Sequence, residues 1–520
     1  MFLLQCLQSM AFAAIVLFPE GDKALQGDLK TANDAYVAGK FPEARKLLLD
    51  LAEKKDADAA YALGRIYQTG EGAPDDKADP ARAEDFYRKA AEKGHEKARL
   101  NLAGLLMSDP KKVLEGMKIL KDTATAGSGK AMLVLGQLYA GGQVVEQNLV
   151  TARDFFEKAA AAGEADGNVL VGQMFEAGQG ADQDITKATE LYEKAAAGKS
   201  IQGMMRLANL YANGAKGLEK NLDKAKEWLT KATESETDGA AAVNLGIILE
   251  NLDKKPADAY KWFQKAADQG NPTGMERLAA LQASGAAGEK KDPKESFAWY
   301  EKAAKAGNVN AMLAVATAYE KGVGTEANPK EAKDWLFKSA FNGSGAAMRE
   351  LAQHYRQGSY GLKDMLAAIA WFKRAIDSGD GEAAIAFASM LQKGEEMPKD
   401  MKSAISLLTR VADAGSAEAQ VQLADIYAQG IGTPVDLIRG YALLLAAGDF
   451  EAAKAKRNEL ALKMSKEQIA EAQKELDRLR GKTTAPAPAP APVPTPTPAP
   501  PAAPAAPAAP AAPAAPAPAQ

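Results

Sequence analysis

The sequence predicts an all-α protein, a solenoid of stacked helix hairpins. The first observation behind this prediction is the spacing of the five tryptophans, which lie 34, 37, 36 and 36 residues apart. They are Trp228, Trp262, Trp299, Trp335 and Trp371. The second is that apolar and small residues recur at helical spacing within each period, and the third is that residues typical of helix ends separate these stretches. Self-similarity at about 20 to 50 residues is typical of repeat architectures, in which each unit buries its apolar face against the next.

An aligned Leu-Gly or equivalent pair marks eleven copies with a mean period of 36 residues. The copies carry this pair at Leu63, Leu102, Leu135, Val171, Leu207, Leu245, Leu278, Val315, Leu351, Phe387 and Leu423. In each copy we expect a first helix, as around Ala60 to Tyr67, then a turn and a second helix, as at Ala83 to Ala91. Two antiparallel helices per copy follow from this pattern.

Capping residues define the expected helix ends. Several second helices open with an N-cap residue followed by proline, because the cap side chain accepts from a free amide and proline takes a position that needs no donor. These pairs are Asp79-Pro80, Asp292-Pro293 and Asn328-Pro329. The same helices are expected to end at glycine, which adopts the left-handed conformation without steric cost. These glycines are Gly94, Gly163, Gly270, Gly307, Gly343, Gly379 and Gly415.

The Gly-x-Gly turns after the first helices are predicted to be helix terminators. They begin at Gly70, Gly178, Gly322 and Gly430. A phosphate-binding loop is excluded because no strand precedes them and because they recur at the repeat period.

The core is predicted to pair small residues with large ones. Glycine or alanine follows the aligned residue in most copies, as at Gly64 and Gly136, and lets the second helix approach closely. Tyrosines three residues further on are expected to fill the seam. One helix pair cannot cover its own apolar faces, so we expect each tryptophan to pack into the next copy, contributing about 1.5 to 3 kcal/mol.

Composition outside the repeats predicts five regions. They are a possible signal peptide or membrane anchor at 1–22, a degenerate capping helix pair at 23–55, the repeats at 56–448, a charged capping helical stretch at 449–482 and a disordered Pro/Ala-rich tail at 483–520. Because Met1 to Phe18 carry no charge and are mostly apolar, export to the periplasm, secretion or membrane anchoring is predicted, with a cytoplasmic location as the alternative.

The tail holds 15 of the 26 prolines and no charge, so it can form neither a core nor a helix. A polyproline II segment of this length would span on the order of 100 Å. Two interpretations of the tail remain open. It is either an inert terminus or a spacer or wall-associated stalk that ties the solenoid to the cell envelope.

Composition also limits the chemistry. A net charge of -4 with both signs interspersed argues against nucleic acid as a partner. The single cysteine, Cys6, excludes an intrachain disulfide framework and thiolate clusters. The two histidines, His95 and His354, lie in different copies and are expected to be helix-surface or turn residues. We therefore predict no metal site, no cofactor and no catalytic residues.

A polar column is the candidate binding site. Two residues after the aligned leucine, the side chains are expected to point away from the apolar stripe, at 100° per residue, and to line an exposed groove of stacked copies. Together with neighbouring arginines and an asparagine, the column comprises Arg65, Gln137, Gln173, Arg206, Asn209, Asn213, Arg349, Gln353, Arg356 and Asp425. Amides and arginine suit peptide backbone and carboxylates, and ordinary polar surface is the alternative interpretation.

The motif Ala-x-x-x-Leu-Gly-x-x-Tyr-x-x-Gly, followed by Lys-Ala-x-x-Trp-x-x-Lys-Ala-Ala-x-x-Gly, resembles the Sel-one-like repeat family, relatives of tetratricopeptide repeats. The clearest copies are Ala131 to Gly163, Ala311 to Gly343 and Ala346 to Gly379. Two copies depart from it: Leu100 to Gly127 lacks the tyrosine and the Gly-x-Gly turn, and Ala240 to Gly270 shortens that turn. The resemblance implies a right-handed α-superhelix that acts as an adaptor in protein assemblies, often bacterial and exported.

The predicted function is therefore a noncatalytic scaffold that holds a protein or peptide partner on its concave face. One alternative is a structural envelope protein spaced or tethered by its tail. A second is hydrolysis of β-lactams, which is credited to cysteine-rich relatives and for which this chain lacks the cysteines.

Overall fold

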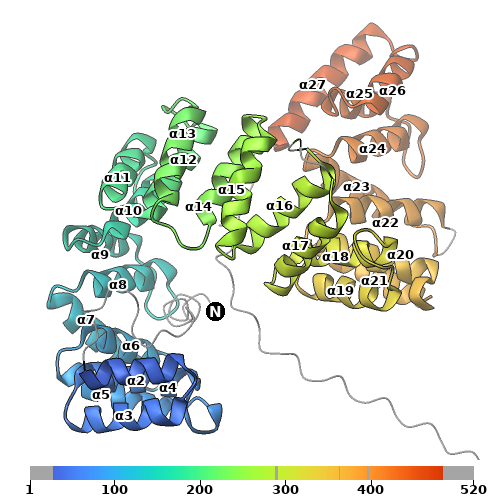
Figure 1. The fold of residues 1–520 in the computed structure, drawn as a ribbon. Coiled ribbons are helices and arrows are strands. Elements are labelled where there is room, and N and C mark those ends of the chain that lie inside the picture. Colours follow the sequence, from blue (N-terminus) through green and yellow to red (C-terminus); the bar gives the residue numbers. More distant parts are fainter. Residues whose placement is uncertain (1–26, 287, 289–290, 362, 395–396, 484–520) are drawn as a thin grey trace, which may run out of the picture. The chain divides into compact units, whose positions relative to one another are not determined.

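The fold of this chain is known from a computed structural model, which describes residues 27–286, 288, 291–361, 363–394 and 397–483. Every named element in these residues is a helix (Figure 1), so the predicted all-α fold of stacked helix pairs is confirmed. The expected signal segment, Cys6 and the tail from residue 484 onward lie outside the described residues. None of the helices in the described part combines the length and the hydropathy needed to cross a membrane.

The chain divides into two compact units, the first ending at Lys254 and the second beginning at Lys255. The elements of unit 1 are α2 (Gly27–Val37), α3 (Phe41–Glu53), α4 (Ala57–Thr69), η1 (Pro74–Asp76), α5 (Pro80–Glu92), α6 (Glu96–Met107), α7 (Val113–Thr125), α8 (Gly129–Gly141), α9 (Leu149–Ala161), α10 (Ala165–Ala177), α11 (Ile185–Ala197), α12 (Ile201–Asn213), α13 (Leu222–Thr233), α14 (Ala240–Ile247) and η2 (Ile248–Leu252). Each α-helix packs against the next, and α4 also contacts α6 as α10 contacts α12. First helices of neighbouring copies therefore adjoin one another.

Unit 2 follows the same plan. Its elements are α15 (Pro256–Asp268), α16 (Pro272–Ser284), α17 (Pro293–Lys305), α18 (Val309–Lys321), α19 (Pro329–Phe341), α20 (Gly345–Gln357), η3 (Ser359–Gly361), α21 (Met365–Asp377), α22 (Gly381–Lys393), α23 (Met401–Asp413), α24 (Ala417–Gln429), α25 (Leu437–Ala446), α26 (Glu451–Ala461) and α27 (Lys466–Thr483). The first helices α20 and α22 contact each other, and α27 packs on α25 and α23.

The charged helical stretch predicted at 449–482 contains two helices, α26 and α27. The break is encoded by a capping box, in which the Gln468 amide donates to Ser465 Oγ at 3.2 Å and the Ser465 amide donates to Gln468 Oε1 at 2.9 Å. These reciprocal bonds start α27 at a new N-terminus.

The predicted helix ends are confirmed. Asp79 caps α5, its Oδ1 accepting from the Arg82 amide at 3.0 Å, and Asn328 caps α19, its Oδ1 accepting from the Glu331 amide at 3.2 Å. Gly94 and Gly70, which follow a second and a first helix, both have a φ of +85°. A residue with a Cβ would be strained there, so these glycines set the helix lengths.

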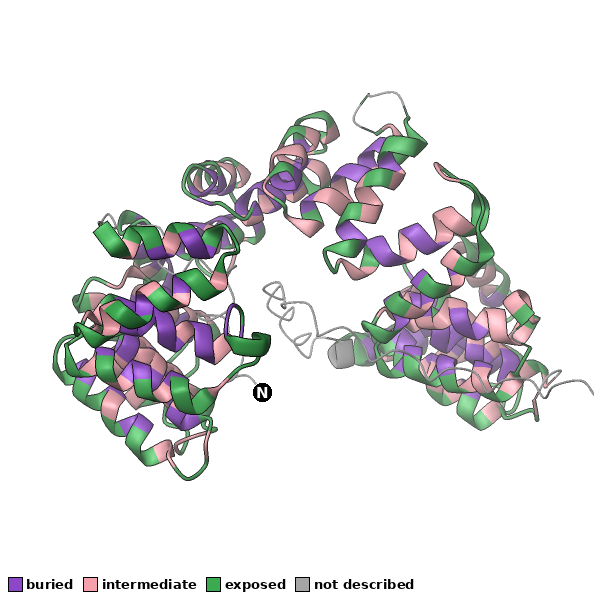
Figure 2. Ribbon diagram, turned by 60° about the horizontal axis from the view of Figure 1, so that its bottom comes forward, coloured by how far each residue is buried: buried purple, intermediate pink, exposed green. Residues whose placement is uncertain are grey.

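The core is built by second-helix rings lying on first-helix glycines. A Cβ at Gly136 would lie 2.4 Å from Cε1 of Phe156, and one at Gly64 would lie 2.4 Å from Cδ1 of Tyr87. Phe156 and Tyr87 are buried, at 3% and 0% exposure. Buried residues recur as stripes along the helices (Figure 2). The close approach predicted from the glycines is present, but the tyrosines expected in the seam are only partly responsible, since Tyr139, Tyr319 and Tyr355 are half-buried.

The tryptophans are less buried than expected. Trp335 and Trp371 are buried, whereas Trp228, Trp262 and Trp299 are half-buried. The cation three residues later lies over each ring, with distances to the centroid from 4.0 to 5.3 Å. These cations are Lys231, Lys265, Lys302, Lys338 and Arg374. The three half-buried indoles therefore lie at the rim of the packing layer, where an amphipathic side chain covers each of them.

Candidate protein-interaction face

The polar column lies on first helices, as its spacing predicts. The helices that carry it are α4 with Arg65, α8 with Gln137, α10 with Gln173, α12 with Arg206, Asn209 and Asn213, α20 with Arg349, Gln353 and Arg356, and α24 with Asp425. Only Asn209 and Asn213 are exposed, and the other eight are half-buried. The expectation that the whole column is an open groove is therefore wrong for most of its members.

In unit 1 the column forms a local cluster across two copies. With its amide oxygen turned toward α12, Gln173 accepts from Arg206 Nε at 3.1 Å and from Nη2 at 2.9 Å. One turn further along α12, Asn213 Nδ2 donates to Asn209 Oδ1 at 2.7 Å. We call Gln173, Arg206, Asn209 and Asn213 the amide patch. In this patch Gln173 holds one edge of the Arg206 guanidinium, and Asn209 and Asn213 are exposed.

In unit 2 the column is used to hold neighbouring copies together. Arg349 Nε donates to Asp380 Oδ2 at 3.1 Å, and Arg349 Nη2 lies 2.7 Å from Glu382 Oε2. Asp425 forms an ion pair with Lys456 of α26. Asp380 is also the N-cap of α22, accepting from the Ala383 amide at 2.7 Å. Arg349 and Asp425 thus have structural partners that the sequence reading missed.

His95 lies in the turn before α6, as predicted, and His354 is a half-buried residue of α20. His95 is the N-cap of α6, where Nδ1 accepts from the Ala98 amide at 3.0 Å and the ring stacks on Tyr61 at 4.4 Å. His354 is 13% exposed, its Nε2 lies 3.7 Å from Glu320 Oε1, and burial lowers the pKa of its imidazole. In the part of the chain that the structure describes, no group of three or more His, Cys, Asp or Glu side chains is placed to hold a metal ion.

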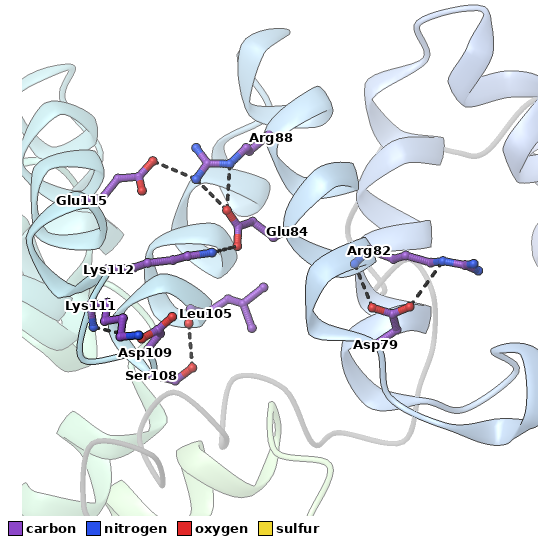
Figure 3. A network of polar contacts seen from close by, with 10 residues as sticks. All are labelled: Asp79, Arg82, Glu84, Arg88, Leu105, Ser108, Asp109, Lys111, Lys112 and Glu115. Atoms are coloured by element: carbon purple, nitrogen blue, oxygen red, sulfur yellow. Dashed lines mark hydrogen bonds and ion pairs between the residues drawn. The ribbon is translucent and has the colours of Figure 1, made fainter.

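An ionic network joins the divergent copy formed by α6 and α7 to the copy before it (Figure 3). Glu84 of α5 accepts from Lys112 Nζ at 2.6 Å and from Arg88 Nη2 at 2.7 Å, and Arg88 also lies 2.8 Å from Glu115 of α7. The hydrogen bond from Lys112, and then Arg88, holds the pKa of the Glu84 carboxyl below its ordinary value. The network therefore links the start of α7 to the second helix of the copy before it.

Replacing Glu84 by glutamine removes its ion pairs with Lys112 and Arg88 and should destabilise unit 1 at neutral pH. The expected loss is only about 1 kcal/mol, because these ion pairs are partly exposed. A lowered pKa in the folded state means that the carboxylate contributes stability above the pKa of the unfolded chain and loses it as the pH falls through the folded value. The difference between wild type and variant should therefore vanish in acid. Urea unfolding from neutral to acidic pH measures it, with Glu92→Gln, at an exposed position of α5, as the control. An equal difference at both ends of the range would contradict the network's role.

The repeat pattern of the chain matches a known family. Ten segments fit the sequence pattern described as "Sel1 repeat". They are residues 57–95, 129–164, 165–200, 201–236, 239–271, 272–308, 309–344, 345–380, 381–416 and 417–449. The chain belongs to the Sel1 repeat family. Between the first two matched segments, α6 and α7 form a helix pair like those on either side. Sel1 repeat proteins generally mediate protein–protein interactions.

Three solved structures show what the chain is similar to. A protective antigen of uropathogenic Escherichia coli with an SLR fold, c5321, is 27% identical, with 84% of this chain and 95% of that chain covered and a TM-score of 0.43. A Sel1 repeat protein from Oxalobacter formigenes is 26% identical, covering 51% of this chain and 97% of its own, with a TM-score of 0.37. A putative Sel1 repeat protein from Klebsiella pneumoniae is 24% identical, with 38% and 98% covered and a TM-score of 0.28. Among curated proteins no match to this chain is found.

Proposed function

We propose that this Sel1 repeat protein is a noncatalytic adaptor that holds a protein or peptide partner on the amide patch of unit 1. The observation that carries the proposal is the exposure of Asn209 and Asn213 beside an arginine already oriented by Gln173. In unit 2, by contrast, Arg349 and Asp425 are engaged in ion pairs between copies.

The chemistry of the amide patch suits a peptide backbone. Beyond the hydrogen bond between them, the two asparagines still offer amide donors and acceptors that match the carbonyl and amide groups of an extended partner segment. Arg206 presents five N–H donors in a fixed plane, of which Gln173 accepts from two groups. The other N–H groups of Arg206 can donate to a carbonyl or carboxylate oxygen of the partner. Because the side chains are ordered before binding, less entropy is lost when the partner docks.

The test uses the full chain and a partner recovered from the native host by affinity purification and identified by mass spectrometry. Binding of that purified partner is then measured by calorimetry to wild type and to Asn209→Ala plus Asn213→Ala. We expect the double variant to bind at least tenfold more weakly, because two paired polar contacts of about 1 kcal/mol each are lost.

The control is Glu190→Ala plus Glu193→Ala, two exposed positions on the second helix α11. Helicity should be unchanged in both variants, since neither pair lies in the core. Equal affinity of the asparagine variant and wild type would overturn the amide patch as the partner site, and turnover of the bound partner would overturn the noncatalytic assignment.

We also propose that the protein is exported, on the composition of residues 1–18, which are uncharged and mostly apolar. Fractionation of the native host and N-terminal sequencing of the recovered protein test this location. Recovery in the cytoplasm with the first residues intact would contradict it.

A further inference from the structure

An exposed aromatic ring in unit 2 breaks the repeat pattern. Phe341, at the end of α19, is 72% exposed. It lies two residues before the glycine that ends the second helix, and in other copies this exposed position is charged or small. The equivalents are Glu92, Ala161, Asp268, Lys305, Asp377 and Asp413. Among the described residues only one other aromatic side chain, Phe450 at 42%, is exposed.

Phe341 belongs to a cluster of three rings on two second helices. Its centroid lies 5.7 Å from that of Trp371 on α21, with an interplanar angle of 75°, and 6.1 Å from that of Phe337. Phe337 also meets Trp371 edge to face, at 6.2 Å. Trp371 is buried and Phe337 half-buried, so the cluster has an anchored base and an open edge. We call Phe337, Phe341 and Trp371 the aromatic platform.

The composition of the tail fits such a platform. From residue 501 the tail has proline at every third position: Pro501, Pro504, Pro507, Pro510, Pro513 and Pro516. Because polyproline II has three residues per turn, these six prolines would form one continuous face along the segment. Proline-rich segments dock on aromatic-lined surfaces at low entropic cost. The segment carries no charge, as an apolar platform requires.

The tail can reach the platform within its own unit. It follows α27, which packs on α25 and α23 of the unit that also holds α19 and α21. The residues between Thr483 and Pro501 cover about 55 Å in the polyproline II conformation. Tethering gives an effective concentration in the millimolar range, so a weak contact is sufficient to populate the docked state.

We propose that residues 501–516 dock on the aromatic platform of the same chain. The platform belongs to unit 2 and shares no residue with the amide patch of unit 1, so the docking and the partner site are tested separately. The tail then covers Phe341 in the free protein.

The test is hydroxyl-radical footprinting of the full chain, which reports the solvent access of Phe341 by mass spectrometry. Replacing Pro504, Pro507, Pro510 and Pro513 by serine should raise oxidation of the peptide that carries Phe341 at least twofold. The matched control replaces Pro486, Pro488, Pro490 and Pro492, which alternate with other residues and lie outside the segment; it should oxidise like wild type. Equal oxidation of Phe341 in all three proteins would overturn the proposal. Protection that disappears on dilution would also overturn it, because the tail of a second copy would then cover the platform.

A second measurement observes the tail itself. In wild type the alanine methyl signals of residues 501–516 should be broadened in carbon–proton NMR spectra, and Phe341→Asp should sharpen them. This substitution places the residue that other copies carry at the same exposed position, as at Asp377. Leu366→Lys is the control, because Leu366 is 80% exposed and Lys330 occupies the equivalent position one copy earlier. Unchanged methyl signals in Phe341→Asp would contradict docking on this ring.

Discussion

Replacing Phe156 by alanine should destabilise the middle of unit 1 by about 3 to 5 kcal/mol. Its ring is 3% exposed and lies against Gly136 of α8, so its loss leaves a cavity between two helices that cannot close without moving one of them. Because each copy is stabilised by its neighbours, the loss should appear in α8, α9 and α10 and should be smaller in α4 and α5.

The adjacent phenylalanine is the matched control. Phe155 is half-buried, stacks on Tyr139 at 5.7 Å and has Lys158 over its ring at 5.6 Å. Its replacement by alanine removes a rim contact and should cost about 1 to 2 kcal/mol. Native-state hydrogen exchange of the α8 and α9 amides measures both variants without assuming two-state unfolding of a repeat array. Equal losses for the two residues would contradict the assignment of Phe156 to the core and Phe155 to the rim.

The helices and their ends were predictable because their signals are local. Asp79 and Asn328 cap helices whatever lies around them, and Gly70 and Gly94 take a backbone conformation that other residues avoid. The depth of burial was not predictable to the same degree. Adjacent positions on a helix differ by 100°, and both can belong to one apolar face. The periodic tryptophans are the most conspicuous signal in the sequence. In four of the five copies, however, the residue after the tryptophan is the more deeply buried, as Phe372 at 0% exposure follows Trp371 at 7%.

The candidate site shows a similar limit. The first-helix positions of the polar column are right, but the sequence reading treated each copy alone and took side chains that point away from the apolar stripe to be open. In the structure, Arg349 reaches Asp380 and Asp425 reaches Lys456, each partner 31 residues further along the chain. Polar residues of complementary charge separated by about one repeat period are therefore a signal for contacts between copies. Asn209 and Asn213 do not follow this pattern, because they bond to each other within one helix, and both are exposed.

Replacing Gly136 by alanine should destabilise the same region, although alanine is the better helix former. Helix propensity favours alanine by about 1 kcal/mol. The added Cβ would lie 2.4 and 2.5 Å from two carbons of the buried Phe156 ring, and overpacking at such a site costs about 3 kcal/mol. The collision should outweigh propensity and leave a net loss of about 2 kcal/mol. In the same helix, Gly141→Ala meets nothing within 4 Å and should instead leave stability equal or slightly higher.

A double variant isolates the contact between these two residues. Elsewhere in the chain, Ala208 and Leu229 occupy the equivalent first- and second-helix positions, and each is 1% exposed. Gly136→Ala with Phe156→Leu recreates that pair. The loss of stability of this double variant, measured by hydrogen exchange, should be smaller than the sum of the losses of Gly136→Ala alone and Phe156→Leu alone by about 1 kcal/mol or more. Additive losses would mean that the alanine is resisted by the surrounding backbone, and the small-against-large fit would then not be the property that fixes the distance between the helices of a copy.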